Sequence, residues 1–218
     1  IIDDGGSLTY EELHERSTAL ARALRHGDIQ QRDRIGVLAR NHRGFIMALC
    51  AHGRLGTDLV LLNTGASAEQ TLAVIREQKI DFLFIDEEFT HMLPEDFDEC
   101  PVAVSWFENY GDTSCVREGW TSMQEMLKTA PPAKWPTAEL PSRPRRGRVI
   151  ILTSGTTGTP KGAKRPEPRS WMPASSIMSR IPLRQRRPAY LAAPLFHTWG
   201  FATAQLCIAL RSTMIMRR

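Results

Sequence analysis

The sequence lacks long hydrophobic runs and has few cysteines. Apolar runs such as those at 59–62 and 149–152 are far shorter than the roughly 20 residues that a membrane-spanning helix needs. The four cysteines form no C-x-x-C pair and have no histidine at zinc-finger spacing, which argues against a zinc site and a disulfide framework. We therefore expect no membrane span, and buried free thiols in a reducing cytoplasm.

A large excess of charge of one sign is also absent. The chain carries 28 Lys and Arg against 24 Asp and Glu, and the two signs intermingle, so a nucleic-acid partner is not expected. Local basic clusters predict solvated faces, or contacts with a phosphate-rich ligand or an anionic membrane surface, which leaves peripheral membrane association open. These clusters are Arg143, Arg145, Arg146 and Arg148; Arg184, Arg186 and Arg187; and Arg217 and Arg218.

A starting methionine and a secretory leader are missing as well. The chain opens on Ile1 with neither a basic leader nor the apolar core of a signal peptide. It closes in an apolar, strand-like stretch at 212–216, an unusual place for a natural terminus. We therefore expect a piece of a longer protein, inactive by itself.

Helix signals are present along the first half of the chain. Thr9 and Glu12 form a capping box that predicts a helix ending at Gly27. Asn41 is the predicted N-cap of a second helix, which Gly56 ends. A third helix follows the capping box formed by residues 67 and 70.

Short apolar runs alternate with these helices and predict buried strands. The runs lie at 35–39, 58–63, 80–85 and 102–106. Strands that alternate with helices form mainly parallel sheets covered on both faces. The predicted fold class is therefore α/β, with layered, mainly parallel sheets flanked by helices.

A proline-rich segment divides the chain. Five prolines between 131 and 144 exclude regular helix and central strand. After it we expect strands at 148–152 and 190–193, a helix within 199–210 and an extended end at 212–216. The predicted organisation is a first α/β portion at 1–130, a Pro/Arg-rich connection at 131–147 and a second portion at 148–218, which together form one incomplete domain.

The strand predicted at 148–152 leads directly into a loop rich in hydroxyls and glycines. Residues 153–162 read TSGTTGTPKG. Glycines let backbone N–H groups approach an oxyanion, hydroxyls donate further hydrogen bonds, and a lysine adds a positive charge, which suits a polyphosphate. The loop is not a Walker A sequence, because Lys161 is followed by Gly162 and not by a Ser or Thr that could bind magnesium.

This loop resembles the phosphate-loop motif of the adenylate-forming superfamily, which comprises acyl-CoA synthetases, luciferases and peptide-synthetase adenylation domains. LTYEEL at 8–13 resembles an early segment of the family, and APLFHTWG at 193–200 resembles its acyl-pocket motif. Among these proteins, the chain looks most like the N-terminal domain of bacterial fatty-acyl-CoA synthetases.

The resemblance implies ATP and magnesium as ligands and coenzyme A as co-substrate. By this match, Thr153 would also contact magnesium. The residues placed on the phosphates are Thr153, Ser154, Gly155, Thr156, Thr157, Gly158 and Lys161.

The resemblance also implies an acyl-binding site, formed by Phe196, His197, Trp199 and Gly200. His197 is the candidate catalytic residue, because it could orient the carboxylate or the adenylate. Packing without ligand contact is the alternative for His197, and a place in the core is the alternative for Trp199. No acidic residue lies between 194 and 205 to pair with the ammonium of an amino acid, which favours a simple apolar acid.

The predicted function is therefore ATP-dependent activation of a carboxylic acid, a fatty acid by preference, through an acyl-adenylate to an acyl-CoA thioester. Two alternatives stay open. One is a fatty-acyl-AMP ligase that loads a carrier protein, and the other is a non-catalytic nucleotide-binding module.

Overall fold

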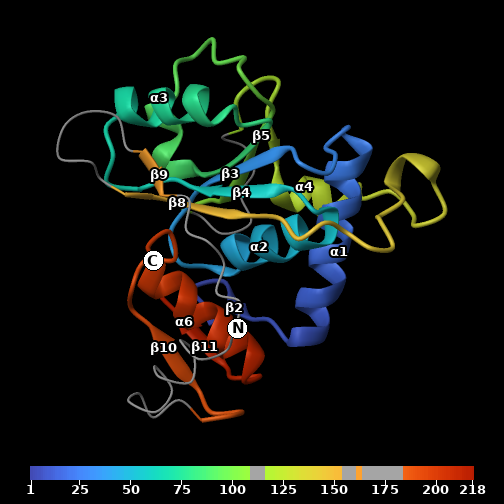
Figure 1. Ribbon diagram of the computed structural model, residues 1–218, viewed down its shortest axis with the longest axis vertical. Coiled ribbons are helices and arrows are strands. Elements are labelled where there is room, and N and C mark those ends of the chain that lie inside the picture. Colours follow the sequence, from blue (N-terminus) through green and yellow to red (C-terminus); the bar gives the residue numbers. More distant parts are fainter. Residues whose placement is uncertain (109–115, 154–160, 164–183) are drawn as a thin grey trace.

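The computed structural model describes residues 1–108, 116–153, 161–163 and 184–218, with the backbone alone at 153 and 161–163. Strands and helices alternate along the chain (Figure 1). The strands are β1 Ile2–Asp3, β2 Gly6–Ser7, β3 Arg34–Leu38, β4 Asp58–Leu61, β5 Phe82–Asp86, β6 Val102–Trp106, β7 Thr121–Ser122, β8 Val149–Thr153, β9 Lys161–Ala163, β10 Ala189–Leu191 and β11 Met214–Met216. The helices are α1 Tyr10–His26, α2 Arg43–Leu55, α3 Ala68–Gln78, α4 Met123–Lys128 and α6 Thr198–Ala209, with short 3-10 turns η1 Glu87–Met92 and η2 Pro136–Ala138.

A seven-stranded sheet forms the centre of the molecule. Its order is β7-β6-β5-β3-β4-β8-β9. All neighbours pair in parallel except β9, which returns antiparallel to β8. The predicted α/β fold class with mainly parallel sheets is confirmed.

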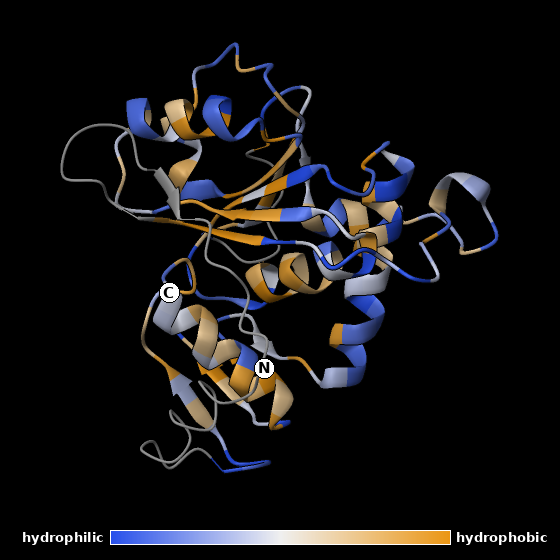
Figure 2. Ribbon diagram, viewed as in Figure 1, coloured by the Kyte–Doolittle hydropathy of each residue, from blue (hydrophilic) through white to orange (hydrophobic). Residues whose placement is uncertain are grey.

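Side chains of the central strands alternate between two hydrophobic cores. In β4, Leu59 and Leu61 face the core under α1 and α2, whereas Val60 and the following Leu62 face the core under α3. This alternation follows from the two-residue repeat of a strand, and both faces are apolar because helices cover both. Figure 2 accordingly shows the strands at the centre as mostly hydrophobic.

A second sheet joins the two ends of the chain. Its order is β10-β11-β1-β2, and β1 pairs in parallel with β11 through Ile2 and Ile215. In Figure 1, α2 lies between the seven-stranded sheet and this second sheet. Both sheets therefore contain strands from the first and the last third of the chain.

The predicted capping boxes and helix ends are confirmed, but one predicted N-cap is wrong. Thr9 caps α1 in a capping box, and Gly56 ends α2 at a left-handed φ of 76°, where glycine is favoured. Asn41 does not cap α2; the cap is His42, whose ring accepts the N–H of Gly44. The amide of Asn41 instead bonds distant backbone, and those long-range partners are invisible to a local capping rule.

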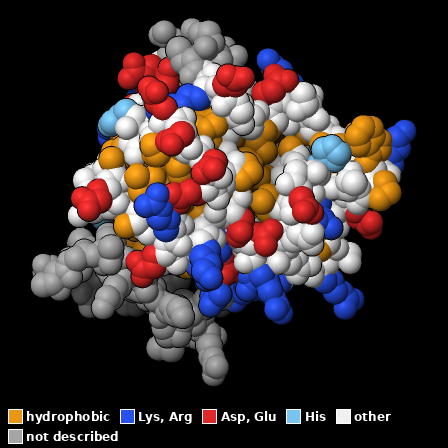
Figure 3. Space-filling view, turned by 90° about the horizontal axis from the view of Figure 1, so that it is seen from above, with side chains coloured by type: hydrophobic (Ala, Val, Ile, Leu, Met, Phe, Trp, Pro, Cys, Tyr) orange, Lys and Arg blue, Asp and Glu red, His pale blue; other side chains and the backbone are white. Residues whose placement is uncertain are grey.

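The surface of the molecule mixes both signs of charge. Acidic and basic side chains intermingle over much of the face in Figure 3, and several basic ones gather along one edge. Exposed pairs such as Arg76 and Glu99, at 2.6 Å, contribute little to stability. Among the described helices, none is long and apolar enough to cross a membrane.

The Pro/Arg-rich connection is anchored on the buried Asp58 at the start of β4. Arg145 and Arg148 both donate to its carboxylate, at 2.5 and 2.8 Å. Burial by itself raises the pKa of Asp58, but the N–H of Arg148 and the two guanidinium groups outweigh it, so the pKa lies below its usual value of 3.8. The ionised carboxylate therefore ties residues 145–148 to the sheet.

Replacing Asp58 with Asn should lower the free energy of unfolding at pH 7 by about 1–3 kcal/mol, a partly solvent-screened loss of a buried ion pair. A lowered folded-state pKa stabilises the protein above the unfolded value of 3.8, and this stabilisation is lost as pH falls through the folded value. Urea midpoints from pH 7 to about 2.5 measure the difference.

The matched control is Asp98→Asn, at an exposed carboxylate. It should leave the urea midpoints near those of the wild type at every pH. If the wild type and Asp58→Asn lost stability in parallel below pH 4, the ion pairs of Asp58 would not carry the effect.

Candidate active site

The predicted phosphate loop begins and ends in the β8–β9 hairpin. Thr153 pairs with Lys161 in antiparallel register, and β8 itself pairs in parallel with β4. Both ends of the loop are thus held at the carboxyl edge of the seven-stranded sheet, where ligands of open α/β sheets bind. Ser154, Gly155, Thr156, Thr157 and Gly158 lie outside the described residues.

The predicted acyl-binding residues lie between β10 and the first turn of α6. Phe196 is buried at 8% exposure in the core shared with α1 and α2, whereas Trp199 is 53% exposed. His197 is exposed at the N-cap of α6, with its ring centre 4.5 Å from that of Phe196. The segment therefore presents one imidazole and one indole to solvent above a buried phenyl ring.

Gly200 packs against the backbone of the preceding turn. A Cβ atom at this position would stand 2.1 Å from the carbonyl oxygen of Pro194, a distance that real side chains do not reach. Glycine is thus required for the first turn of α6 to approach residue 194 so closely. The start of α6 and the turn before it form one packed unit.

Asn41 connects this unit to the carboxyl edge of the large sheet. It follows β3, and its Nδ2 donates to the carbonyl oxygens of Leu191, at 3.2 Å, and Ala193, at 2.9 Å. Its Oδ1 accepts the N–H of Leu195 at 2.8 Å. Since β3 lies next to β4 and β4 next to β8, the phosphate-loop hairpin and the acyl-pocket motif are both anchored at this edge.

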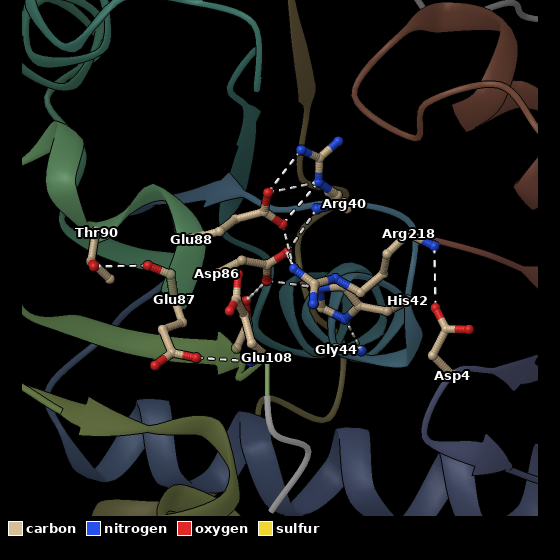
Figure 4. A network of polar contacts seen from close by, with 11 residues as sticks. Asp4, Arg40, His42, Gly44, Asp86, Glu87, Glu88, Thr90, Glu108 and Arg218 are labelled. Atoms are coloured by element: carbon tan, nitrogen blue, oxygen red, sulfur yellow. Dashed lines mark hydrogen bonds and ion pairs between the residues drawn. The ribbon is translucent and has the colours of Figure 1, made fainter. Parts of the chain in front are cut away.

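A buried polar network lies at the same edge, at the ends of β5 and β6 (Figure 4). His42 and Asp86 have fully buried side chains, with Nε2 and Oδ1 2.8 Å apart. Ser105 donates to the same Oδ1 at 2.7 Å, and the N–H of Arg40 donates to Oδ2 at 2.9 Å. The carboxylate of Asp86 therefore accepts from three donors, two in the connection between β3 and α2 and one in β6.

The hydrogen bonds of His42 define its tautomer. The N–H of Gly44 lies 3.0 Å from Nδ1, and a backbone N–H can only donate, so Nδ1 is the acceptor. Nε2 then carries the hydrogen and donates to Asp86. The ring also stacks on Trp106 at 4.8 Å. His42 is thus a neutral, fully partnered core histidine and not an accessible proton carrier.

Two arginines extend the network from the large sheet to the second sheet. Arg40 binds Glu88 at 2.7 Å. Arg218 contacts Glu88, lies 3.8 Å from Asp86, and stands over the ring of Trp106 at 5.3 Å. These charges join the carboxyl edge of the large sheet to the end of β11.

Sequence reasoning missed Asp86, His42 and Ser105. A signal was available, because polar residues that directly follow buried parallel strands collect at one sheet edge. Asp86 directly follows the strand predicted at 80–85, His42 lies three residues after the one predicted at 35–39, and Ser105 is the last residue but one of the strand predicted at 102–106. Their mutual contacts, 19 and 44 residues apart in sequence, depend on strand order and could not be inferred from local patterns.

A metal cage is not formed by the described residues. Among residues 1–108, 116–153, 161–163 and 184–218, no group of three or more His, Cys, Asp or Glu is arranged so that it could hold a metal ion. Magnesium commonly binds through phosphates and water with only one or two protein oxygens. The described residues therefore form no metal site of their own.

The family of the chain follows from its sequence match. The predicted phosphate loop and the predicted acyl-binding residues are both tethered at the carboxyl edge of the parallel sheet, and residues 1–218 match the family of AMP-binding enzymes. The chain belongs to this family.

The names of individual relatives mention two kinds of acid, a long-chain fatty acid and 2-succinylbenzoate. The chain is 25% identical to the long-chain fatty acid transport protein 6 of Homo sapiens over 100% of its length and 35% of the relative. It is also 25% identical to the 2-succinylbenzoate–CoA ligase of Bacillus thuringiensis subsp. konkukian, over 89% of its length and 35% of the relative. The chain thus spans about a third of the length of the relatives it matches.

Solved structures share the fold. The o-succinylbenzoate CoA synthetase of Bacillus subtilis, in complex with the acyl-adenylate OSB-AMP, aligns with a TM-score of 0.73 at 22% identity, over 99% of this chain and 40% of that one. The N-terminal domain of FACL13 from Mycobacterium tuberculosis aligns with a TM-score of 0.77 at 21% identity, over 99% and 52%.

Proposed function

We propose that this chain forms part of an ATP-dependent acid–CoA ligase that activates a carboxylic acid through an acyl-adenylate. The observation that supports this most is the anchoring of two motifs at one sheet edge. The β8–β9 hairpin holds both ends of the phosphate loop, and Asn41 holds the turn that carries His197. Adenylation needs such a meeting of nucleotide and acid, because the two reacting groups must be held in line.

The proposed chemistry has two steps. First, a carboxylate oxygen forms a bond to the α-phosphorus of ATP, and the bond to the bridging oxygen breaks, so that pyrophosphate leaves with the electron pair. Then the thiolate of coenzyme A forms a bond to the acyl carbon, and AMP leaves. Donors aimed at the departing pyrophosphate stabilise the charge that develops there.

We propose that the loop residues stabilise this charge on the pyrophosphate. The hydroxyls and backbone N–H groups of residues 153–158 and the ammonium group of Lys161 would bind the phosphates. Thr153 would add one hydroxyl contact to a phosphate-bound magnesium ion. His197, which is exposed at the start of α6, would orient the carboxylate with one ring nitrogen.

We further propose that the acid is apolar, with a fatty acid as the first candidate. The first turn of α6 carries no acidic residue, so the ammonium group of an amino acid would stay unpaired there. Phe196 and Trp199 supply apolar surface. An aromatic acid is the second candidate, because several relatives are named 2-succinylbenzoate–CoA ligases. Transfer to a carrier protein remains the alternative for the second step.

Replacing Lys161 with Ala should slow adenylate formation. One charge-assisted contact to phosphate contributes about 1.5–3 kcal/mol, which corresponds to a roughly tenfold to hundredfold slower reaction. The measurement is acid-dependent exchange of labelled pyrophosphate into ATP, in the protein encoded by the complete gene.

The matched control is Lys134→Ala, at an exposed lysine of the Pro/Arg-rich connection. It removes the same charge from the surface and should leave the exchange rate near the wild-type value. An unchanged exchange rate in Lys161→Ala would mean that the hydroxyls and backbone N–H groups of the loop bind the phosphates without Lys161. No exchange with any acid in the wild type would point to a non-catalytic nucleotide-binding module.

A further inference from the structure

The turn between β10 and α6 is held by one distant polar side chain. We call residues 192–197 the 192–197 connection. Strand β10 ends at Leu191 and α6 begins at Thr198, so this described stretch belongs to neither a strand nor a helix. Within it, the N–H of His197 bonds the carbonyl oxygen of Pro194 at 3.1 Å. A side chain from outside, the amide of Asn41, also bonds this stretch.

Asn41 holds the connection on both sides of Pro194. Its Nδ2 binds the carbonyl oxygen of Ala193 and its Oδ1 binds the N–H of Leu195. The amide is planar and Asn41 is only 7% exposed, so these bonds fix the direction of the backbone at residue 194. Moving the connection would leave a buried amide without partners, which is costly.

The fixed turn sets the position of the acyl-pocket side chains. The carbonyl oxygen of Pro194 is packed against Gly200 so closely that a Cβ there would stand at 2.1 Å. A shift of the 192–197 connection therefore carries the first turn of α6 with it. Phe196, His197 and Trp199 lie on this unit and would move together.

We propose that Asn41 is a positioning residue for acid recognition: its amide fixes the 192–197 connection and so places Phe196, His197 and Trp199 at the carboxyl edge of the sheet. This inference rests on the proposed function. It predicts that loss of the amide alters how the enzyme chooses among acids more than how it binds ATP, because the phosphate loop is held separately by the β8–β9 hairpin.

A side chain that bonds the other end of α6 provides the control. The hydroxyl of Tyr10 lies 3.3 Å from the carbonyl oxygen of Cys207 and 2.7 Å from that of Ser212. These bonds join α1 to the end of α6 and to the segment before β11. Tyr10→Phe therefore removes side-chain bonds to the far end of α6 and to Ser212 without changing any bond to the 192–197 connection.

The test compares Asn41→Ala, Asn41→Asp and Tyr10→Phe with the wild type in the protein encoded by the complete gene. In acid-dependent pyrophosphate exchange, Asn41→Ala should raise KM for palmitate about tenfold, the scale of one or two lost hydrogen bonds, and bring kcat/KM for palmitate and octanoate closer together. KM for ATP should stay within about twofold. Asn41→Asp should be no better than Asn41→Ala, because it keeps the acceptor but loses the donor to two carbonyl oxygens.

The outcomes separate the inference from the proposed function. If Tyr10→Phe alters the palmitate-to-octanoate ratio as much as Asn41→Ala, or if the Asn41 variants lower kcat/KM for all acids equally, Asn41 is a structural residue and the inference is wrong. If the wild type exchanges with no acid, the proposed function itself fails. Should Asn41→Ala not fold, Asn41→Ser provides the same comparison, since its short hydroxyl cannot span both sides of Pro194.

Discussion

Replacing Asp86 with Ala should lower the free energy of unfolding by about 3–5 kcal/mol, because three donors would lose one shared carboxylate acceptor at a cost of about 1–3 kcal/mol each. The change leaves the Nε2–H of His42, the hydroxyl of Ser105 and the N–H of Arg40 without their acceptor. The side chains of Asp86 and His42 are fully buried, so bulk water has little access to the bond between them. The midpoint and slope of urea unfolding at pH 7 measure the loss.

A carboxylate at the surface gives the control for this prediction. Glu99 pairs with Arg76 at 2.6 Å, with side chains 26% and 64% exposed. Glu99→Ala should cost less than about 1 kcal/mol, because exposed ion pairs gain little over solvation. An Asp86→Ala variant as stable as Glu99→Ala would show that the network at the carboxyl edge does not contribute to stability.

The value of kcat/KM should differ by orders of magnitude between acids of different chain length. Each buried methylene contributes about 0.8 kcal/mol, so a few carbons in an apolar channel multiply into a large ratio of kcat/KM. We expect apolar acids to be preferred over phenylalanine, and we expect Trp199→Ala to alter the chain-length profile. The measurement is adenylation of acetate, octanoate, palmitate, benzoate, 2-succinylbenzoate and phenylalanine in the protein encoded by the complete gene.

The exposure of Trp199 separates an effect on selectivity from an effect on stability. At 53% exposure, the indole contributes little to the core, so its removal should change selectivity without unfolding the protein. The control is Trp135→Ala, at an indole that is 47% exposed and stands edge-on to His26. It should leave the profile unchanged. Preference for phenylalanine would contradict the assignment to apolar acids, and preference for 2-succinylbenzoate would keep the mechanism with an aromatic acid.

Elements with strong local signals could be predicted from the sequence, and weaker ones could not. The strand predicted at 102–106 and the helix predicted within 199–210 are present as β6 and α6. Helix α4, with six residues, and the two-residue strands β1, β2 and β7 were not predicted. Such short elements are too brief to show a period, and tertiary contacts decide whether they form.

The sequence by itself determined the α/β class, the capping boxes of α1 and α3 and the loop motif at 153–162. These features depend on residues within a few positions of each other, so local chemistry is sufficient to define them. The predicted phosphate and acyl residues were also read this way, from a motif in each case. Their individual roles await the measurements described above.

Only the tertiary structure decided which of these features meet. Asn41, expected as a helix cap, turns its amide to backbone 150 residues away, and β1 pairs with β11 across almost the whole chain. The same strand order brings His42, Asp86 and Ser105 together at one edge. No local period encodes strand order, because it results from how the helices and both cores pack around the sheets.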